Sequence, residues 1–238
     1  MTRDRASFTL TGKTASFDPR IEAVRGDLAD VALAGKLFAP HYAQAVETVC
    51  ARPFAPVCDK PGGEQVSELL SGEAFMLLDV SGGWAWGWSA LDHYVGYVEA
   101  NALDPQFPKS VLSPAPDHVA AAEAFLGEPY VWGGRGGEGI DCSGLVQRAL
   151  AAIGIAAPRD SDMQRDGLGT LIDEGAPLRR GDLIFFPGHV GLKYDKDNLL
   201  HATRHHGKTV IEPLALVVAR VKAENDGVGI VACRRVVA

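Results

Sequence analysis

The 238-residue chain is poor in cysteine, and its few cysteines lie far apart. They are Cys50, Cys58, Cys142 and Cys233, with no CxxC pair among them. This spacing excludes a zinc ribbon, and the small number excludes a secreted scaffold held together by disulfides. We therefore expect a reduced protein in which one cysteine can have a chemical role that the other three lack.

Long apolar runs are also missing. The longest, at 183–187 and 214–219, are far shorter than the roughly 18 residues that cross a membrane. The first twenty residues, MTRDRASFTLTGKTASFDPR, are interrupted early by charges and contain no apolar stretch of the kind a secretory signal requires. If this chain is complete, we expect a cytoplasmic protein, with export by a route without a classical signal left open.

Positive charge is scarce as well. Lys and Arg number 23 against 30 Asp and Glu, which gives a net charge of −7. This balance argues against a protein whose main task is to grip nucleic acid or an anionic membrane. With 47% hydrophobic and 22% charged residues, the composition is that of a globular protein.

The chain divides near residues 107–116, where FPKSVLSPAP carries three prolines. Before this linker, aromatic and β-branched runs at 74–80, 84–88 and 94–98 are separated by SGG and LDH, a pattern typical of short antiparallel strands. We expect a small barrel over residues 43–106. Residues 1–42 are expected to pack on it, with a short helix at 27–37.

A different pattern follows the linker, in residues 117–238. Apolar spacing predicts helices at 116–126 and 142–153, and strands are predicted at 183–186, 189–194, 198–202, 210–213 and 229–234. Helices that precede a sheet in this way indicate an α+β domain.

Cys142 lies where a glycine-dense loop, 133–139, leads into the second helix. A helix start presents unpaired N–H groups and partial positive charge, which favour a thiolate and can hold an oxyanion. The simpler alternative, a small residue buried at a crowded helix end, is the commoner fate of a cysteine. The other three cysteines are assigned to it.

A nucleophilic thiol needs a base, and the base needs an orienting partner. His189 begins one predicted strand, and His201 lies twelve residues later in the next, so a hairpin can bring them side by side. Each histidine alone is more readily explained as structural. Together with Cys142, they form a plausible catalytic set.

These residues also carry a family resemblance. The runs EPYVWGGRGGEGIDCSGLVQ, PRDSDMQ, GDLIFFPGHVGL and LLHA resemble the NlpC/P60 family of papain-like bacterial cysteine peptidases, from about Asp117 to the C-terminus. The resemblance implies that Cys142 is the nucleophile, that His189 is the base and that His201 orients its imidazole. It also implies that Tyr130 helps to position substrate or to stabilise the oxyanion.

Residues VSELLSGE and DHYVGYV resemble, less closely, a bacterial SH3-like domain. Members of the family with such a barrel include γ-D-glutamyl-L-diamino acid endopeptidases, which cut peptidoglycan stem peptides and need a free N-terminal L-Ala. The resemblance implies a papain-like α+β peptidase domain preceded by a small SH3-like β-barrel, with peptidoglycan peptides as substrate. The implied substrate contacts are Asp141, Ser143, Asp160 and Ser161, with Glu68 and Tyr94 from the barrel.

Several alternatives stay open at this point. Isolated aspartates such as Asp141 and Asp160 more often serve as a helix cap and a turn residue. An amidase or acyltransferase of related fold would use the same Cys and His, and a non-catalytic wall-binding protein is the alternative from another class. No cofactor is implied, and although His201, His205 and His206 lie close in sequence, a metal site is not expected because no cysteine is near.

Overall fold

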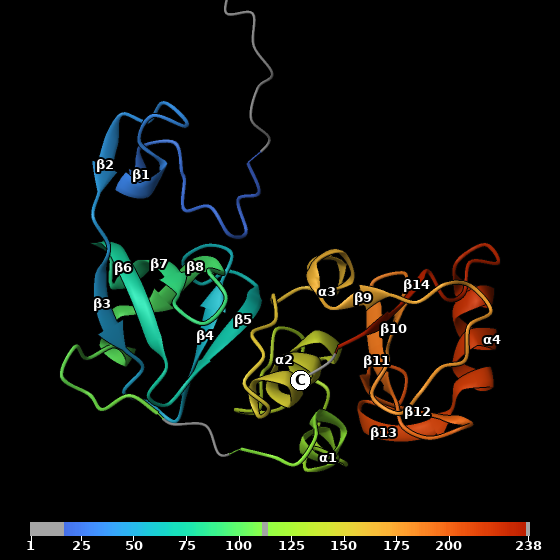
Figure 1. Cartoon of the computed structure of the whole chain (residues 1–238). Helices are drawn as coiled ribbons and strands as arrows, with labels where there is room; N and C mark the ends of the chain where they lie inside the picture. Colours follow the sequence, from blue (N-terminus) through green and yellow to red (C-terminus); the bar gives the residue numbers. More distant parts are fainter. Residues whose placement is uncertain (1–16, 111–113, 237–238) are drawn as a thin grey trace, which may run out of the picture.

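The N-terminal half is built on one antiparallel sheet. The computed structural model describes residues 17–110 and 114–236 (Figure 1). Six strands in the order β3-β6-β7-β8-β4-β5 surround a core that includes Leu69, Phe75 and Val98. The strands are β3 (Val46–Val49), β4 (Phe54–Cys58), β5 (Gln65–Leu70), β6 (Ala74–Ser81), β7 (Trp84–Ser89) and β8 (Val95–Glu99), followed by a 3₁₀ turn at Ala100–Ala102.

The hairpin between β6 and β7 illustrates how sequence sets this sheet. Gly82 and Gly83 both adopt positive φ, at 57° and 83°, and Ser81 pairs with Trp84 across the turn. Two successive positive-φ residues match the right-handed twist of the flanking strands. The SGG run is therefore a two-residue turn that fixes the register of the two strands.

The described part of the N-terminal segment lies on this barrel. Strands β1 (Leu28–Asp30) and β2 (His41–Ala43) pair in parallel, and a single 3₁₀ turn (Val31–Leu33) follows β1. The expected helix at 27–37 is wrong: Asp30 caps only that turn through Ala32 N, and its other oxygen accepts a 3.0 Å hydrogen bond from Trp88 Nε1 of the barrel. These bonds to Asp30 tie the segment to β7. Residues 1–16 lie outside the described residues.

The C-terminal half holds a second sheet between helices. Its strand order is β13-β12-β11-β10-β14-β9. The strands are β9 (Thr170–Leu171), β10 (Leu183–Phe186), β11 (His189–Lys193), β12 (Asn198–Thr203), β13 (Lys208–Pro213) and β14 (Ala232–Arg235). The helices are α1 (His118–Glu123), α2 (Cys142–Ala151), α3 (Ser161–Gly167) and α4 (Leu214–Glu224).

Strand β10 shows how the two faces of this sheet are used. Leu183 and Phe185 belong to the core cluster that contains α2, whereas Ile184 and Phe186 pack with Val217 of α4. Because successive strand residues point to opposite faces, a fully apolar strand is buried on both sides. Figure 1 shows α2 and α4 on opposite sides of the sheet. The expected architecture, an antiparallel barrel followed by an α+β domain, is confirmed.

Some elements differ from the expectations. Helix α1 ends before Leu126, which is exposed rather than packed with Val119. Strand β14 begins at Ala232, and helices α3 and α4 were not expected. Of the expected linker at 107–116, residues 111–113 lie outside the described residues. No helix in the described ranges has the length and apolar character that a membrane crossing needs.

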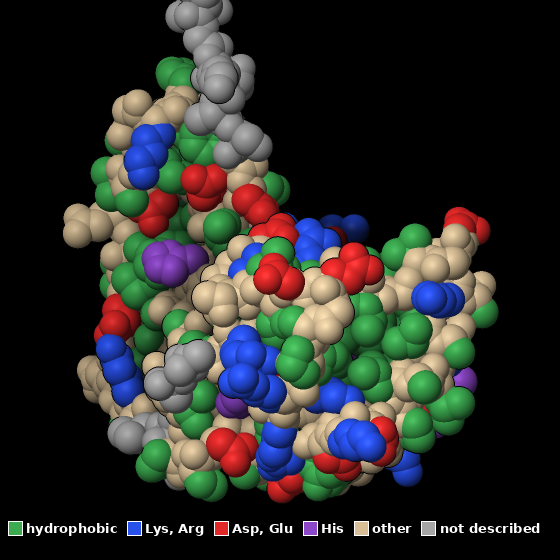
Figure 2. Space-filling view, turned by 45° about the vertical axis from the view of Figure 1, so that its right-hand side comes forward, with side chains coloured by type: hydrophobic (Ala, Val, Ile, Leu, Met, Phe, Trp, Pro, Cys, Tyr) green, Lys and Arg blue, Asp and Glu red, His purple; other side chains and the backbone are tan. Residues whose placement is uncertain are grey.

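The two halves meet through buried charge. Arg135, only 1% exposed, donates from Nη2 to Glu73 Oε1 at 3.0 Å. Glu68 of β5 accepts at Oε2 from the backbone N–H groups of Arg135 and Gly137, at 2.8 and 2.9 Å. The barrel therefore holds the glycine loop directly, and in Figure 2 the upper-left lobe runs without a break into the rest of the molecule.

Candidate functional site

Cys142 is the first residue of α2 and is 5% exposed. Asp141 caps the helix by accepting from Gly144 N at 2.7 Å, which satisfies one of the free N–H groups of the first turn. The loop crosses tightly over this turn, because a Cβ on Gly144 would collide with the carbonyl oxygen of Gly134. Glycines on either side of Asp141 thus let the loop and the helix start approach each other.

The thiol is held in its neutral form. Burial, and next the carboxylate of Asp141, raise the pKa of Cys142 to about 12. The backbone N–H of Val190, the Arg159 charge and the N–H of Ser143 act in the opposite direction but do not prevail. Burial therefore opposes the preference for a thiolate that the helix start provides, and it is the largest influence on this pKa.

His189 lies on β11 directly before Val190, whose N–H approaches the Cys142 thiol. No hydrogen bond joins the thiol to the His189 ring among the described contacts. His189 Nε2 is instead 2.7 Å from His201 Nδ1 on β12. The ring nitrogen left over for a proton from Cys142 is therefore Nδ1 of His189.

The hairpin register explains how the two histidines meet. Leu192 pairs with Leu200, so His201 stands opposite Gly191 and His189 is its diagonal neighbour. A Cβ on Gly191 would lie 3.0 Å from the Cβ of His201. Because Gly191 has no side chain, the His201 side chain has room to reach His189. The two histidines therefore meet diagonally, not as a directly opposed pair.

Both imidazoles are neutral at pH 7. Burial lowers the pKa of His189 to about 3, assisted by His201 and Arg220, and burial lowers the pKa of His201 to about 4. A neutral His189 has a free lone pair and can accept a proton. The arrangement is chemically suited to general-base activation of a thiol.

Behind His201 lies a carboxylate that the sequence did not single out as functional. Glu212 Oε1 is 2.9 Å from His201 Nε2 and 2.6 Å from Arg220 Nη2. His206 Nε2 lies 3.3 Å from Glu212 Oε2. Across residues 17–110 and 114–236, no group of three or more His, Cys, Asp or Glu is placed to hold a metal ion.

Two adjoining pockets flank the Cys and His. The first, about 330 Å³, is lined by Cys142 and by most of the expected substrate contacts, and the second, about 400 Å³, is lined by both histidines. The first is lined by Arg20, Val66, Tyr94, Trp132, Asp141, Cys142, Ser143, Asp160, Ser161, Asp162 and Gly188. Trp132 and Gly188 line both pockets, so the two form one cleft.

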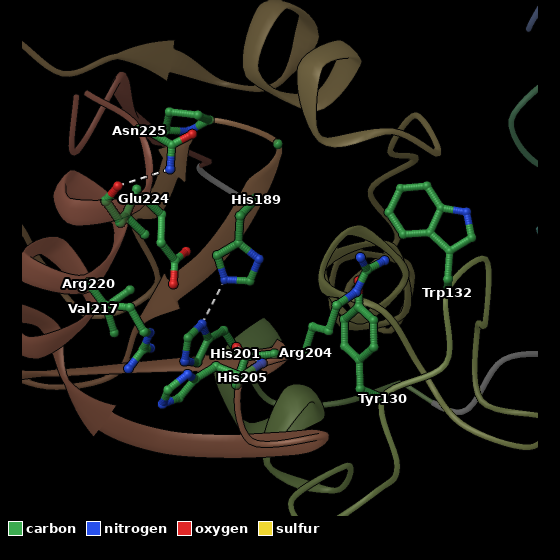
Figure 3. A pocket seen from close by; sticks show the side chains of 14 residues that line it. Tyr130, Trp132, His189, His201, Arg204, His205, Val217, Arg220, Glu224 and Asn225 are labelled. Atoms are coloured by element: carbon green, nitrogen blue, oxygen red, sulfur yellow. Dashed lines mark hydrogen bonds between the residues drawn. The ribbon is translucent and has the colours of Figure 1, made fainter. Parts of the chain in front are cut away.

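Figure 3 shows the second pocket from close by. His189 stands in its middle with the dashed bond to His201, Arg220 lies on one side, and Tyr130 and Trp132 stand on the other. Arg204 lies over the rings of Tyr130 and Trp132, at 5.8 and 5.6 Å from their centroids. The expected Tyr130 thus shares the pocket of His189.

Asp160 and Tyr94 meet in the first pocket, although they come from different halves of the chain. The Tyr94 hydroxyl donates to Asp160 Oδ2 at 3.1 Å. Arg20, which sequence reasoning missed, donates from Nη1 to the same oxygen at 2.9 Å and also pairs with Asp162. Burial raises the pKa of Asp160. No local pattern could have revealed Arg20, because it lies 140 residues from Asp160.

Two expected substrate contacts have structural roles instead. Glu68, 2% exposed, does not line either pocket, because both of its described side-chain bonds go to loop N–H groups. Asp141 borders the first pocket, but its carboxylate accepts from Gly133 N and Gly144 N and pairs with Arg159 at 2.6 Å. The expected substrate contact at Glu68 is therefore corrected, whereas Asp141 lies at the pocket with its carboxylate already bound by the protein.

Two parts of the chain match known protein families. Residues 127–219 match the model of the NlpC/P60 family, and residues 57–103 match the bacterial dipeptidyl-peptidase Sh3 domain. A gamma-D-glutamyl-L-lysine dipeptidyl-peptidase from Bacillus cereus is 36% identical over 108 residues, which is 42% of this chain and 32% of that protein. Dipeptidyl-peptidase 6 from Lysinibacillus sphaericus is 28% identical over 67% of this chain and 62% of that protein.

Among solved structures, an NlpC/P60 family protein from Bacillus cereus aligns over 81% of this chain and 63% of its own, with 23% identity and a TM-score of 0.46. The matched part covers less than two thirds of each of these relatives. The chain therefore carries a domain of the NlpC/P60 family, preceded by a bacterial SH3 domain.

Proposed function

We propose that this protein is a cysteine endopeptidase that hydrolyses the bond between γ-D-Glu and the L-diamino acid of peptidoglycan stem peptides. The observation that carries the proposal is the Cys142 thiol at the start of α2, in one cleft with the hydrogen-bonded pair His189 and His201. The names of relatives, which include a bifunctional muramidase/DL-endopeptidase from Bacillus subtilis, support the same reaction class.

In the proposed reaction, His189 Nδ1 takes the Cys142 proton as the thiol attacks the γ-D-Glu carbonyl. Backbone N–H groups at the start of α2 hold the oxyanion. His189 then gives the proton to the leaving amine, and the acyl-enzyme is hydrolysed by a water that His189 activates. Because both resting groups are neutral, proton transfer accompanies attack rather than preceding it.

The first pocket is the proposed place of the acyl side of the peptide, with its free N-terminal L-Ala. Asp160 supplies the carboxylate that an ammonium group needs when it leaves water. Both described side-chain bonds to Asp160 fall on Oδ2, which leaves Oδ1 to accept from the ammonium. Tyr94, Ser143 and Ser161 border the same space.

A requirement for a free amine would suit fragments released from the wall rather than intact wall. The proposal therefore includes a role in recycling wall peptides in the cytoplasm. Support for it comes from the Asp160 carboxylate in the first pocket, which suits a substrate with a free amine.

The test is mass spectrometry of the products from L-Ala-γ-D-Glu-diaminopimelate with a free or an acetylated N-terminus. We expect cleavage only after γ-D-Glu, a large loss of rate on acetylation, and turnover at least about 10³-fold lower in Cys142→Ala. The matched control is Cys233→Ala, which removes a cysteine outside the cleft.

Equal rates on both peptides would favour an amidase or acyltransferase and would remove the requirement for the amine. Failure of iodoacetamide to label Cys142, together with no turnover of either peptide, would favour a wall-binding protein. Retention of more than a few per cent of activity in Cys142→Ala would overturn the proposed nucleophile.

A further inference from the structure

A line of four polar side chains runs behind the nucleophile across the sheet. His189 on β11 contacts His201 on β12, His201 contacts Glu212 on β13, and Glu212 pairs with Arg220 on α4. The three interatomic distances are 2.7, 2.9 and 2.6 Å. Only the first two members belong to the catalytic set that the sequence predicts.

Strand register produces this line. His201 pairs with Val210, so Glu212 lies two residues further along β13 and is a diagonal neighbour of His201. The same diagonal offset separates His189 from His201 across β11 and β12. Side chains on one face of neighbouring strands reach each other over such diagonals when they are long.

The protons on this line can be assigned from its far end. Burial alone would raise the pKa of Glu212, but hydrogen bonds from Arg220, His206 and His201 lower it to about 2. The carboxylate is therefore ionised at neutral pH and can only accept hydrogen bonds. His201, which is neutral, must place its single proton on Nε2 to donate to Glu212.

The proton position on His201 in turn determines the proton position on His189. With its proton on Nε2, His201 has a bare Nδ1, which accepts from His189 Nε2. His189 is neutral as well, so its one proton is used in this bond. Its Nδ1 is left unprotonated, which is the state that a base for the Cys142 thiol requires.

We propose that Glu212 is a positioning residue that sets the tautomers of both histidines and so keeps Nδ1 of His189 free to accept the thiol proton. This inference rests on the proposed peptidase function. Arg220 keeps Glu212 charged and fixes its direction, and thereby removes the alternative in which a protonated Glu212 donates to His201 and reverses both tautomers.

The first test measures the tautomers themselves. ¹⁵N NMR of labelled histidines is recorded at pH 7.5 on the full chain carrying Cys142→Ala, so that no thiol can give a proton to His189. We expect a proton on Nε2 and a bare Nδ1 for both His189 and His201. A proton on Nδ1 of His189 in this protein, which still has Glu212, would by itself overturn the proposal.

Adding Glu212→Leu, which keeps most of the side-chain volume but removes the acceptor, is expected to make the Nδ1–H form of His189 appear. Glu174→Leu is the matched control, because Glu174 is exposed and lies outside both pockets of the cleft. An unchanged His189 spectrum in a folded Glu212→Leu protein would show that Glu212 only supports β13 structurally.

Kinetics provide the second test, with Cys142 intact and the free-amine peptide as substrate. A wrong tautomer of the catalytic histidine in a Ser-His-Asp triad reduces kcat by about 10⁴-fold. Glu212 is separated from His189 by the His201 ring, so for Glu212→Leu we expect a smaller loss in kcat, about 10²-fold, with little change in KM. In a His201→Ala background, Glu212→Leu should change kcat by less than about 3-fold, because the ring through which Glu212 acts on His189 is absent.

An equal loss in both backgrounds would overturn the action through His201. Failure of the proposed function gives a different result: the unmodified chain would not cleave the peptide at all, while the NMR spectra would still report both tautomers. The two failures are therefore distinguishable.

Discussion

At the scale of single residues, the site is set by how deeply its titratable groups are buried. His201 is 1% exposed, and burial lowers its pKa to about 4 from an ordinary value of 6.5. As the pH falls, His201 is therefore protonated at a lower pH in the folded state than in the unfolded state. The stabilisation associated with a neutral His201 is complete above pH 6.5 and is lost between pH 6.5 and about 4.

We predict that lowering the pH from 7 to 5 reduces the free energy of unfolding by about 2 kcal/mol through His201 alone. Urea unfolding of the chain and of His201→Gln, at both pH values, measures this contribution. The difference between the two pH values should shrink by about 2 kcal/mol in the variant. An unchanged difference would mean that His201 has the same pKa in the folded and the unfolded protein.

Residue motifs are also where sequence reasoning reached furthest. Cys142, His189 and His201 could be proposed because a glycine loop, a helix start and two successive strands are local patterns. Glu212 has a similar local signal, since it lies one strand after His201, but a single carboxylate in a strand is too common to stand out. The role of Glu68 could not be predicted, because its partners belong to a loop about 70 residues away.

At the scale of elements, the N-terminal segment reaches the first pocket. The backbone carbonyl of Arg20 accepts from Val95 N of β8, and its guanidinium bonds Asp18, Asp160 and Asp162. The Arg20 guanidinium is therefore already paired with Asp160, the carboxylate that is proposed to bind the substrate ammonium. The two positive groups compete for Asp160.

We predict that Arg20→Ala lowers KM for the free-amine peptide by about 2- to 5-fold, the range expected for a partly exposed ion pair, with kcat unchanged. Steady-state kinetics on free and acetylated peptides measure it, and only the free amine should respond. Arg25→Ala is the control, because Arg25 pairs with Asp27 and Asp79 of the same lobe instead. A higher KM in Arg20→Ala would indicate that Arg20 orients Asp160 for the substrate.

Elements with uniform burial were predictable, and those with mixed burial were not. Strand β10 was predicted over its observed residues because it is apolar throughout. Helix α4 was missed although Leu214, Val217, Val218 and Val221 follow helical spacing. Its valines also suit a strand, and only two of its residues are buried. The short α3 was missed because Asp160, which stands at its N-cap position without a side-chain capping bond, is equally typical of a turn.

At the scale of the whole molecule, the barrel and the C-terminal domain are joined by buried arginine side chains. Arg135 is buried with Glu73 as its acidic partner, and Arg159 of the catalytic half reaches Ser67 Oγ of β5 at 3.2 Å. A buried ion is expensive to leave unpaired. The interface therefore resists separation, even though the two halves have separate cores.

We predict that Glu73→Gln, which leaves the Arg135 charge without its counterion, lowers the free energy of unfolding by about 3 kcal/mol. Glu47→Gln, which breaks the exposed pair with Lys109, should cost less than about 1 kcal/mol. Urea unfolding midpoints compare the two variants. Equal shifts would contradict the view that the interface pair is insulated from solvent.

The contacts between Glu68 and the glycine loop have a consequence for how this architecture can be recombined. One strand of the barrel supplies a hydrogen-bond acceptor, the Glu68 carboxylate, to the backbone of the loop directly ahead of Cys142. A barrel borrowed from another protein would bring a different pattern of acceptors, even if its own core were sound. A chimera should therefore exchange the barrel and residues 133–139 together, as one unit.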